Sequence, residues 1–259
     1  MTDSAQITPA QAIEVYWVPG CSSCLRMKEF IERTGFAFES VNLADAPGRM
    51  AKLDRIGVSA PAVAVGERGV QGLDLVGIAA LIGYDYDPPE MLSPAVMKAK
   101  YDTVITALQR FTSQLSGEHL DYRSPDNNRS VRFLIAHAAS IMRYFVDAYD
   151  QESFDNSGRP PADLSTTGTR AELLAFTADT ATMLTTWWDT YGFDDPFDRV
   201  LATSWGHRTL HEVFERAVWH TAQHTRQLMD WMETIGVPPA DPLTREDLAG
   251  LPLPERLMT

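Results

Sequence analysis

The stretch VYWVPGCSSCLRM, residues 15–27, decides the fold of the first part of the chain. The run at residues 12–18 predicts a β-strand, because β-branched and aromatic residues dominate it. Apolar residues at helical spacing predict a helix over residues 24–34. Cys21 and Cys24, the two cysteines of the chain, therefore lie where the strand gives way to the helix.

The segments that follow complete a small α/β pattern. Short apolar runs predict strands, amphipathic runs predict helices, and glycines close several of them. The predicted strands cover residues 36–43 and 62–65 with a hairpin at 66–69, and the predicted helices cover 46–56 and 73–82. This order is typical of a compact α/β domain, which we place at residues 1–86.

The character of the sequence changes after a linker at residues 87–93. Long helical patterns take over and no further strands are predicted, which favours a four-helix bundle at residues 94–236. The four predicted helices cover residues 94–116, 129–149, 169–191 and 207–235. A proline-rich tail at residues 237–259 follows the bundle.

Composition narrows the class of protein. A chain of 259 residues with 44% hydrophobic residues is long enough for two folded domains. The formal net charge of −13 disfavours binding to nucleic acids and to anionic membranes. The sequence has neither a transmembrane-length apolar run nor the basic and apolar regions of a signal peptide, so we expect a cytoplasmic protein.

The spacing of Cys21 and Cys24 indicates dithiol chemistry. A helix N-terminus favours a thiolate, which makes Cys21 the candidate nucleophile and Cys24 the residue that resolves a mixed disulfide. Two ordinary cysteines or half of a zinc site are the alternative interpretations. No second pair of cysteines is present to complete such a zinc site.

The segment 12–84 resembles the glutaredoxin branch of the thioredoxin superfamily through VYWVPGCSSC and Ser59-Ala60-Pro61. The resemblance implies a thioredoxin-like fold in which Pro61 is cis and faces the dithiol. It also implies that Ala60, Pro61, Gly72 and Asp74 lie beside a bound thiol substrate, with glutathione as one candidate for a low-molecular-weight thiol.

Histidines provide the second set of candidate site residues. His220 and His224 are four residues apart on the last predicted helix, so they share a face and are able to hold one metal ion. His137 lies within an apolar helical pattern, where a hydrogen-bonded core histidine is the alternative to a metal ligand. For His220 and His224, the alternative to a metal site is a pair of histidines that have this spacing by chance.

The segment 94–236 resembles the DinB-like superfamily of metal-binding four-helix bundles through LIAHAAS, with His137, and WHTAQHTRQL, with His220 and His224. The resemblance implies that these three histidines bind a divalent metal with an open position. Zinc suits such a site best, and nickel, manganese and iron are alternatives. Members of the superfamily include thiol-dependent transferases and isomerases, and such bundles often dimerise.

Several charged residues near the histidines in sequence are further candidates. Each arginine is a candidate to bind a substrate carboxylate, and a surface ion pair is the alternative for each of them. Each carboxylate is a candidate to accept a hydrogen bond from a histidine ligand. The arginines are Arg132, Arg143 and Arg226, and the carboxylates are Asp147, Asp179 and Glu215.

Together these patterns favour a metal- and thiol-dependent transferase, lyase or isomerase coupled to a disulfide-reducing domain. One alternative is a glutaredoxin-type thiol–disulfide oxidoreductase whose bundle selects client proteins. The other is a non-enzymatic, metal-binding protein of redox stress. The expected partners are a small thiol or disulfide and a second copy of the chain, with neither nucleic acid nor membrane.

Overall fold

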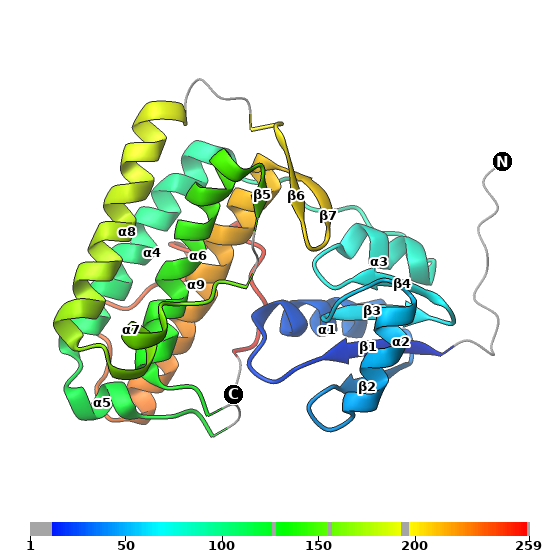
Figure 1. Ribbon diagram of the computed structural model, residues 1–259, viewed down its shortest axis with the longest axis horizontal. Helices are drawn as coiled ribbons and strands as arrows, with labels where there is room; N and C mark the ends of the chain where they lie inside the picture. Colours follow the sequence, from blue (N-terminus) through cyan, green and yellow to red (C-terminus); the bar gives the residue numbers. More distant parts are fainter. Residues whose placement is uncertain (1–11, 126–127, 155–156, 193–196, 258–259) are drawn as a thin grey trace. The chain divides into compact units, whose positions relative to one another are not determined.

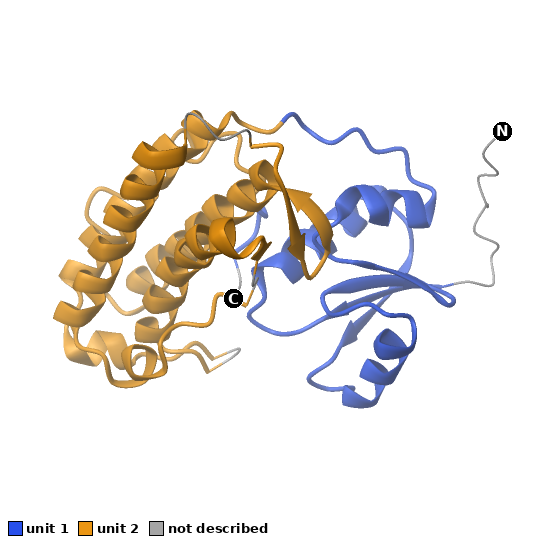
Figure 2. Ribbon diagram, turned by 45° about the horizontal axis from the view of Figure 1, so that its top comes forward, with its two compact units in different colours: residues 1–90, 254–258 blue, residues 91–253, 259 orange. Residues whose placement is uncertain are grey.

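The computed structural model describes residues 12–125, 128–154, 157–192 and 197–257. The chain divides into two compact units, shown in Figure 2. Unit 1 comprises residues 1–90 together with residues 254–258, and unit 2 comprises residues 91–253 and 259. None of the helices in the described ranges combines the length and apolar character needed to span a bilayer.

Unit 1 is built on a mixed sheet with the strand order β2-β1-β3-β4 (Figure 1). Strand β1 pairs in parallel with β2 and antiparallel with β3, which continues through a hairpin into β4. The strands are β1 (Ile13–Trp17), β2 (Phe38–Asn42), β3 (Ala62–Val65) and β4 (Arg68–Gln71), and the α-helices are α1 (Ser22–Thr34), α2 (Met50–Arg55) and α3 (Leu75–Ile82). A short 3₁₀ helix at Pro47–Arg49 leads into α2. The element order agrees with the order predicted from the sequence.

Side-chain alternation along the strands gives this sheet two buried faces. Ile13 and Val15 pack with residues of α1 and α3 in one apolar cluster. Tyr16 packs on the other face, in a second cluster that includes Leu53 of α2. The sheet is therefore covered by helices on both sides, which is the layered architecture expected of a thioredoxin-like domain.

The end of the chain contributes to unit 1. Glu29 on α1 is only 6% exposed, and its carboxylate accepts backbone N–H bonds from Glu255 at 2.8 Å and from Arg256 at 2.9 Å. The guanidinium of Arg256 adds a bond to Glu29 at 3.2 Å and pairs with Glu32 at 2.6 Å. A buried carboxylate needs such donors, so the C-terminal segment completes the surroundings of α1.

Replacing Glu29 by glutamine should destabilise unit 1. We expect the free energy of unfolding to fall by about 1–3 kcal/mol, because a buried acceptor for charge-assisted bonds is lost. Glu32→Gln is the matched control: it removes only a more exposed ion pair, which should contribute less than about 1 kcal/mol. Urea denaturation with hydrogen exchange of α1 measures both effects. Equal effects of the two substitutions would contradict a specific role of Glu29.

Unit 2 is a helical bundle whose four long helices are α4 (Pro94–Gln114), α6 (Val131–Gln151), α8 (Arg170–Tyr191) and α9 (Leu210–Thr234). Helix α6 packs against α8 and α9, and α4 packs against the same two helices (Figure 1). Two short helices, α5 (Gly117–Asp121) and α7 (Ala162–Thr167), lie in the connections. Five tryptophans of this unit are buried, namely Trp187, Trp188, Trp205, Trp219 and Trp231.

The prediction that unit 2 contains no strands is wrong. A small sheet joins β5 (Ser153–Phe154), β6 (Val200–Thr203) and β7 (Gly206–Thr209). Helix α9 consequently begins at Leu210 and not at residue 207, because Thr209 and Glu212 form a reciprocal capping box that fixes its start. Strands of two to four residues are too short to show a period in the sequence.

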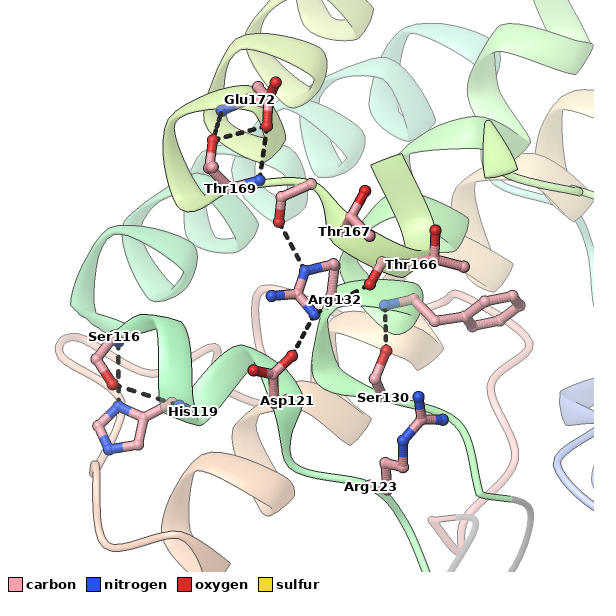
Figure 3. Close-up of polar contacts among 12 residues, drawn as sticks. Ser116, His119, Asp121, Arg123, Ser130, Arg132, Thr166, Thr167, Thr169 and Glu172 are labelled. Carbon is pink, nitrogen blue, oxygen red and sulfur yellow. Dashed lines mark hydrogen bonds and ion pairs between the residues drawn. The ribbon is translucent and has the colours of Figure 1, made fainter. Parts of the chain in front are cut away.

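Arg132, a candidate carboxylate receptor in the sequence, is instead a buried structural residue (Figure 3). Its guanidinium donates to the Gly168 carbonyl at 2.6 Å and pairs with Asp121. It therefore ties α6 to α5 and to the segment that precedes α8.

Candidate metal centre and dithiol

Three histidines from two helices of the bundle converge. The Nε2 atom of His220 on α9 lies 3.1 Å from Nε2 of His137 on α6 and 2.8 Å from Nε2 of His224. One ring nitrogen from each residue lies within 4.8 Å of the other two, and all three side chains are buried. The structure thus brings together the three residues that the sequence predicted as metal ligands.

Hydrogen bonds on the far side of two rings determine which nitrogens face the centre. Nδ1 of His137 lies 2.7 Å from the Gly158 carbonyl, and Nδ1 of His224 lies 3.0 Å from the side-chain oxygen of Gln227. Both partners are acceptors, so each Nδ1 carries the proton and each Nε2 presents its lone pair. This arrangement is how proteins commonly orient histidine ligands of a metal.

Burial keeps these imidazoles neutral. It lowers the pKa of His137 to about 4, and the positive charges of Arg129 and Arg216 act in the same direction. The pKa values of His220 and His224 are also lowered well below the usual range, again mainly by burial. Neutral imidazoles are the form that binds a metal, so protons do not compete for these nitrogens near neutral pH.

The donor set fits a divalent cation. The Nε2 lone pairs of His137 and His224 both face Nε2 of His220. A cation accepts all three lone pairs when His220 carries its proton on Nδ1, and without a cation a neutral His220 can donate from Nε2 to a neighbouring ring. Nitrogen ligands of a tetrahedral ion lie about 3.4 Å apart at metal–nitrogen distances of about 2.1 Å, close to the spacing of these rings. A divalent metal with an open position is therefore compatible with the three residues, and zinc suits the ligand type.

The remaining histidines lie elsewhere. His119 accepts the Ser116 backbone N–H at 3.1 Å and caps α5, and His207 is exposed on β7. His211 contacts the Leu92 carbonyl at 2.8 Å. Within the part of the chain that the structure describes, one group of three potential metal ligands forms, and it contains only His137, His220 and His224.

Other candidates from the sequence have different partners. Arg143 pairs with Asp179 at 2.7 Å, and Arg226 donates to the side chain of Gln223 at 2.9 Å. The Nδ1–H groups of His137 and His224 donate to the Gly158 carbonyl and to the Gln227 side-chain oxygen, and not to the predicted carboxylates.

Sequence analysis missed both of these supporting groups. The spacing of Gln227, three residues after His224 on the same helix, was a signal that could have been used. The role of Gly158 depends on a loop contact and leaves no local pattern. Gly158 has φ +54°, and a Cβ there would lie 2.0 Å from Cδ1 of Ile141 and 3.0 Å from Cε1 of His137. Only glycine allows this close approach to α6.

The dithiol begins helix α1. Cys21 is the N-cap residue, and its sulfur accepts the Cys24 backbone N–H at 3.0 Å. The two cysteines form a disulfide with Cα atoms 5.2 Å apart. Cys24 is 2% exposed, whereas Cys21 is more accessible. Accessibility and the helix N-terminus both favour Cys21 as the attacking sulfur of the reduced form.

The predicted thiol-binding residues surround the end of β4. The Ala60–Pro61 peptide bond is cis, as the resemblance implies. The Gly72 N–H donates to the Pro61 carbonyl at 2.7 Å, and a Cβ at Gly72 would lie 2.6 Å from the Met27 sulfur and 2.9 Å from Cβ of Pro61. Asp74 is the N-cap of α3 and accepts the Gly77 N–H at 2.9 Å. These contacts give Gly72 and Asp74 structural roles, and their role in thiol binding stays a prediction.

The fold and the two sites define a two-domain protein, with a dithiol thioredoxin-like unit and a helical bundle that carries a three-histidine group. Residues 13–70 match the Glutaredoxin family model, and residues 100–228 match the model of the DinB superfamily. The chain therefore carries a glutaredoxin-like domain followed by a DinB-like four-helix bundle, which confirms the predicted fold class.

The bundle is also similar to a solved structure. YfiT from Bacillus subtilis, described as "a probable metal-dependent hydrolase with an unusual four-helix bundle topology", aligns with a TM-score of 0.48 at 18% sequence identity. The alignment covers 59% of this chain and 95% of that chain. A search of curated proteins finds no match to the chain.

The three histidines predict one bound metal ion per chain. Alanine at His137, His220 or His224 should remove most of it, because each substitution leaves two ligands on a site built for three. His207→Ala is the matched control, since this exposed histidine lies outside the group and should leave the metal content unchanged. Elemental analysis of the purified variants measures the stoichiometry. Unchanged metal content in the first three variants would contradict the site.

The loop glycine should control metal affinity without being a ligand. Gly158→Ala forces the loop away from Ile141 and releases the bond that orients His137, so we expect metal affinity to fall about 10–100-fold. Gly117→Ala is the control, since a Cβ at that glycine meets nothing within 4 Å. Competition with a chromophoric chelator measures both dissociation constants. Equal affinity in the two variants would show that Gly158 does not position the ligand.

Proposed function

We propose that the protein is a metal- and thiol-dependent enzyme whose glutaredoxin-like domain reduces a disulfide formed from the thiol. The convergence of three neutral imidazoles in the bundle carries this proposal. The dithiol on the same chain supports it, because it would return the thiol co-substrate to its reduced form whenever an external two-electron oxidant, such as a peroxide, has converted that thiol to its disulfide. The reaction of the bundle would be a transfer, elimination or isomerisation that uses a low-molecular-weight thiol.

The bundle supplies a dry and oriented ligand set. A divalent cation held by the three histidines would act as a Lewis acid and lower the pKa of a thiol placed at its open position. His137 and His224 are held in one tautomer by Gly158 and Gln227, so these two rings do not need to reorient when a metal ion binds. Burial of the rings excludes water from their side of the site.

The dithiol would act by thiol–disulfide exchange. In the reduced protein, the Cys21 thiolate attacks one sulfur of the substrate disulfide, and the other sulfur leaves as a thiolate that takes up a proton. Cys24 then gives up its proton and attacks the sulfur of Cys21, which releases the second thiol and forms the Cys21–Cys24 disulfide. Two molecules of an external thiol return this disulfide to the dithiol by supplying two electrons and two protons, and they are joined as a disulfide themselves.

A test that separates the two chemistries uses single substitutions in the full chain. Cys21→Ser should abolish reduction of a small disulfide, such as that of 2-mercaptoethanol, because the attacking sulfur is lost. His137→Ala should abolish metal-dependent addition of the thiol to an electrophile and leave disulfide reduction within about twofold. Thiol consumption and disulfide reduction are measured in parallel for the two variants.

Each other pattern of results supports a different function. If metal removal leaves the rate of disulfide reduction unchanged and no metal-dependent thiol chemistry is found, the result would favour a plain oxidoreductase whose bundle selects client proteins. Metal binding with neither activity would favour a non-enzymatic redox-stress protein. Either outcome would overturn the proposed coupling of the two domains.

A further inference from the structure

A cavity in unit 2 is formed by helices α6 and α8 and by the loop that leads into α7. Its volume is about 370 Å³, within the range of about 300–1,000 Å³ that is usual for small-molecule sites. Phe176 of α8 and the rings of Pro160 and Pro161 give it apolar surface. The charged and polar side chains of its lining include Arg143, Tyr144 and Asp147 of α6 and Arg159 of the loop.

Two arginines present hydrogen-bond donors at this cavity. Arg143 uses Nη1 to bind Asp179 at 2.7 Å and Oγ1 of Thr180 at 3.2 Å, so its charge is already paired with a carboxylate. Its guanidinium carbon lies 5.0 Å from the centre of the Phe176 ring, and an arginine that packs on a ring still donates from the edge of its plane. Among the residues that the structure describes, neither Nε and Nη2 of Arg143 nor the guanidinium of Arg159 has a hydrogen-bond partner.

One carboxylate at the same cavity is also unpaired. Asp147 lies one helical turn after Arg143 on α6, and in the described part of the chain its carboxylate forms no ion pair or hydrogen bond. Because Asp179 balances Arg143, the cavity keeps one unbalanced positive charge, on Arg159, and one unbalanced negative charge, on Asp147. A simple anion or cation would satisfy only one of these charges, whereas a molecule that carries a group of each sign satisfies both.

The loop that lines this cavity also orients a metal ligand. Nδ1 of His137 donates to the Gly158 carbonyl at 2.7 Å, and the Tyr144 hydroxyl donates to the carbonyl of the next residue, Arg159, at 3.0 Å. His137 and Tyr144 are seven residues apart on α6, so they lie on one face of the helix two turns apart. The loop is thus held to α6 at two successive carbonyls, one at the metal ligand and the other at the cavity.

We propose that this cavity binds a small zwitterion, such as an apolar α-amino acid, and that the bound molecule is an effector of the three-histidine centre. The carboxylate pairs with Arg159 and Arg143, the ammonium group pairs with Asp147, and the apolar part lies on the aromatic and proline rings. By holding Arg159, the ligand fixes the loop and with it the Gly158 carbonyl that orients His137. The effector role rests on the metal centre of the proposed function, whereas binding of the zwitterion does not.

Calorimetric titration of the full, metal-free chain tests the ligand class. The probes are phenylalanine, which carries both charges, 3-phenylpropionate, which lacks the ammonium group, and 2-phenylethylamine, which lacks the carboxylate. We expect phenylalanine to bind one-to-one and at least about threefold more tightly than either analogue, the gain that a charge pair near the surface gives. Equal affinity for phenylalanine and one of its analogues would overturn the zwitterion class.

Two substitutions of exposed residues locate the site. Asp147→Asn should remove the preference for phenylalanine over 3-phenylpropionate, and Arg159→Gln should weaken the binding of both acids by about threefold or more. Asp150→Asn and Arg245→Gln are the matched controls, since these exposed residues do not line the cavity and should leave all affinities unchanged. Phenylalanine binding that is insensitive to both Asp147→Asn and Arg159→Gln would overturn the assignment to this cavity.

Thermodynamic reciprocity tests the effector role. If the zwitterion strengthens zinc binding, zinc must strengthen phenylalanine binding by the same factor, which we expect to be about fivefold or more. Titration of the zinc-loaded and the metal-free chain measures this factor. Tyr144→Phe removes the bond to the Arg159 carbonyl, so it should bring the factor close to one and leave the metal-free affinity within about threefold. A factor that persists in Tyr144→Phe would mean that phenylalanine binds the metal directly, and would overturn the effector role.

The outcomes distinguish this inference from the proposed function. If the chain binds no zinc, the metal centre of the proposed function fails and the effector role fails with it, while the metal-free titration still decides whether the zwitterion site exists. If zinc binds and leaves the phenylalanine affinity unchanged, the metal centre is supported and the effector role is wrong.

Discussion

Burial of three imidazoles at one point is the constraint on which the bundle depends. Polar groups in a dry core must be satisfied, and two of the rings satisfy Nδ1 through Gly158 and Gln227. Their Nε2 atoms both face Nε2 of His220, an arrangement that suits a shared cation or a hydrogen bond donated by His220. Helices α6 and α9 must pack closely for the rings to meet. Thr221 strengthens this contact by donating to the Ala138 carbonyl at 3.1 Å.

Local sequence patterns predicted the parts of the site that lie on regular elements. The spacing of His220 and His224 follows from the helical period, and the N-cap position of Cys21 follows from the change from strand to helix. Gly158 lies outside any long element, and its carbonyl approaches His137 across 21 residues of sequence.

Long-range contacts were also beyond the reach of sequence patterns. Glu29 looks like an ordinary polar position on an amphipathic helix, yet its carboxylate is buried by backbone groups 226 and 227 residues away. The predicted tail at residues 237–259 likewise looked uniform. Its two parts differ, because Arg110 and Gln114 of α4 bind the backbone of residues 238–241, whereas Glu255 and Arg256 belong to unit 1. In each case the structural role comes from a contact with a residue far away in the sequence, and a periodic pattern of residues does not reveal such a contact.

This division of the tail makes the bundle an insertion within unit 1, since residues 91–253 are bounded on both sides by segments of that unit. The chain therefore passes between the units twice, once at residues 90–91 and once at residues 253–254. Because the second crossing ends at the buried carboxylate of Glu29, it holds only while α1 is folded. The helix that begins with the dithiol therefore also anchors the chain that returns from the bundle.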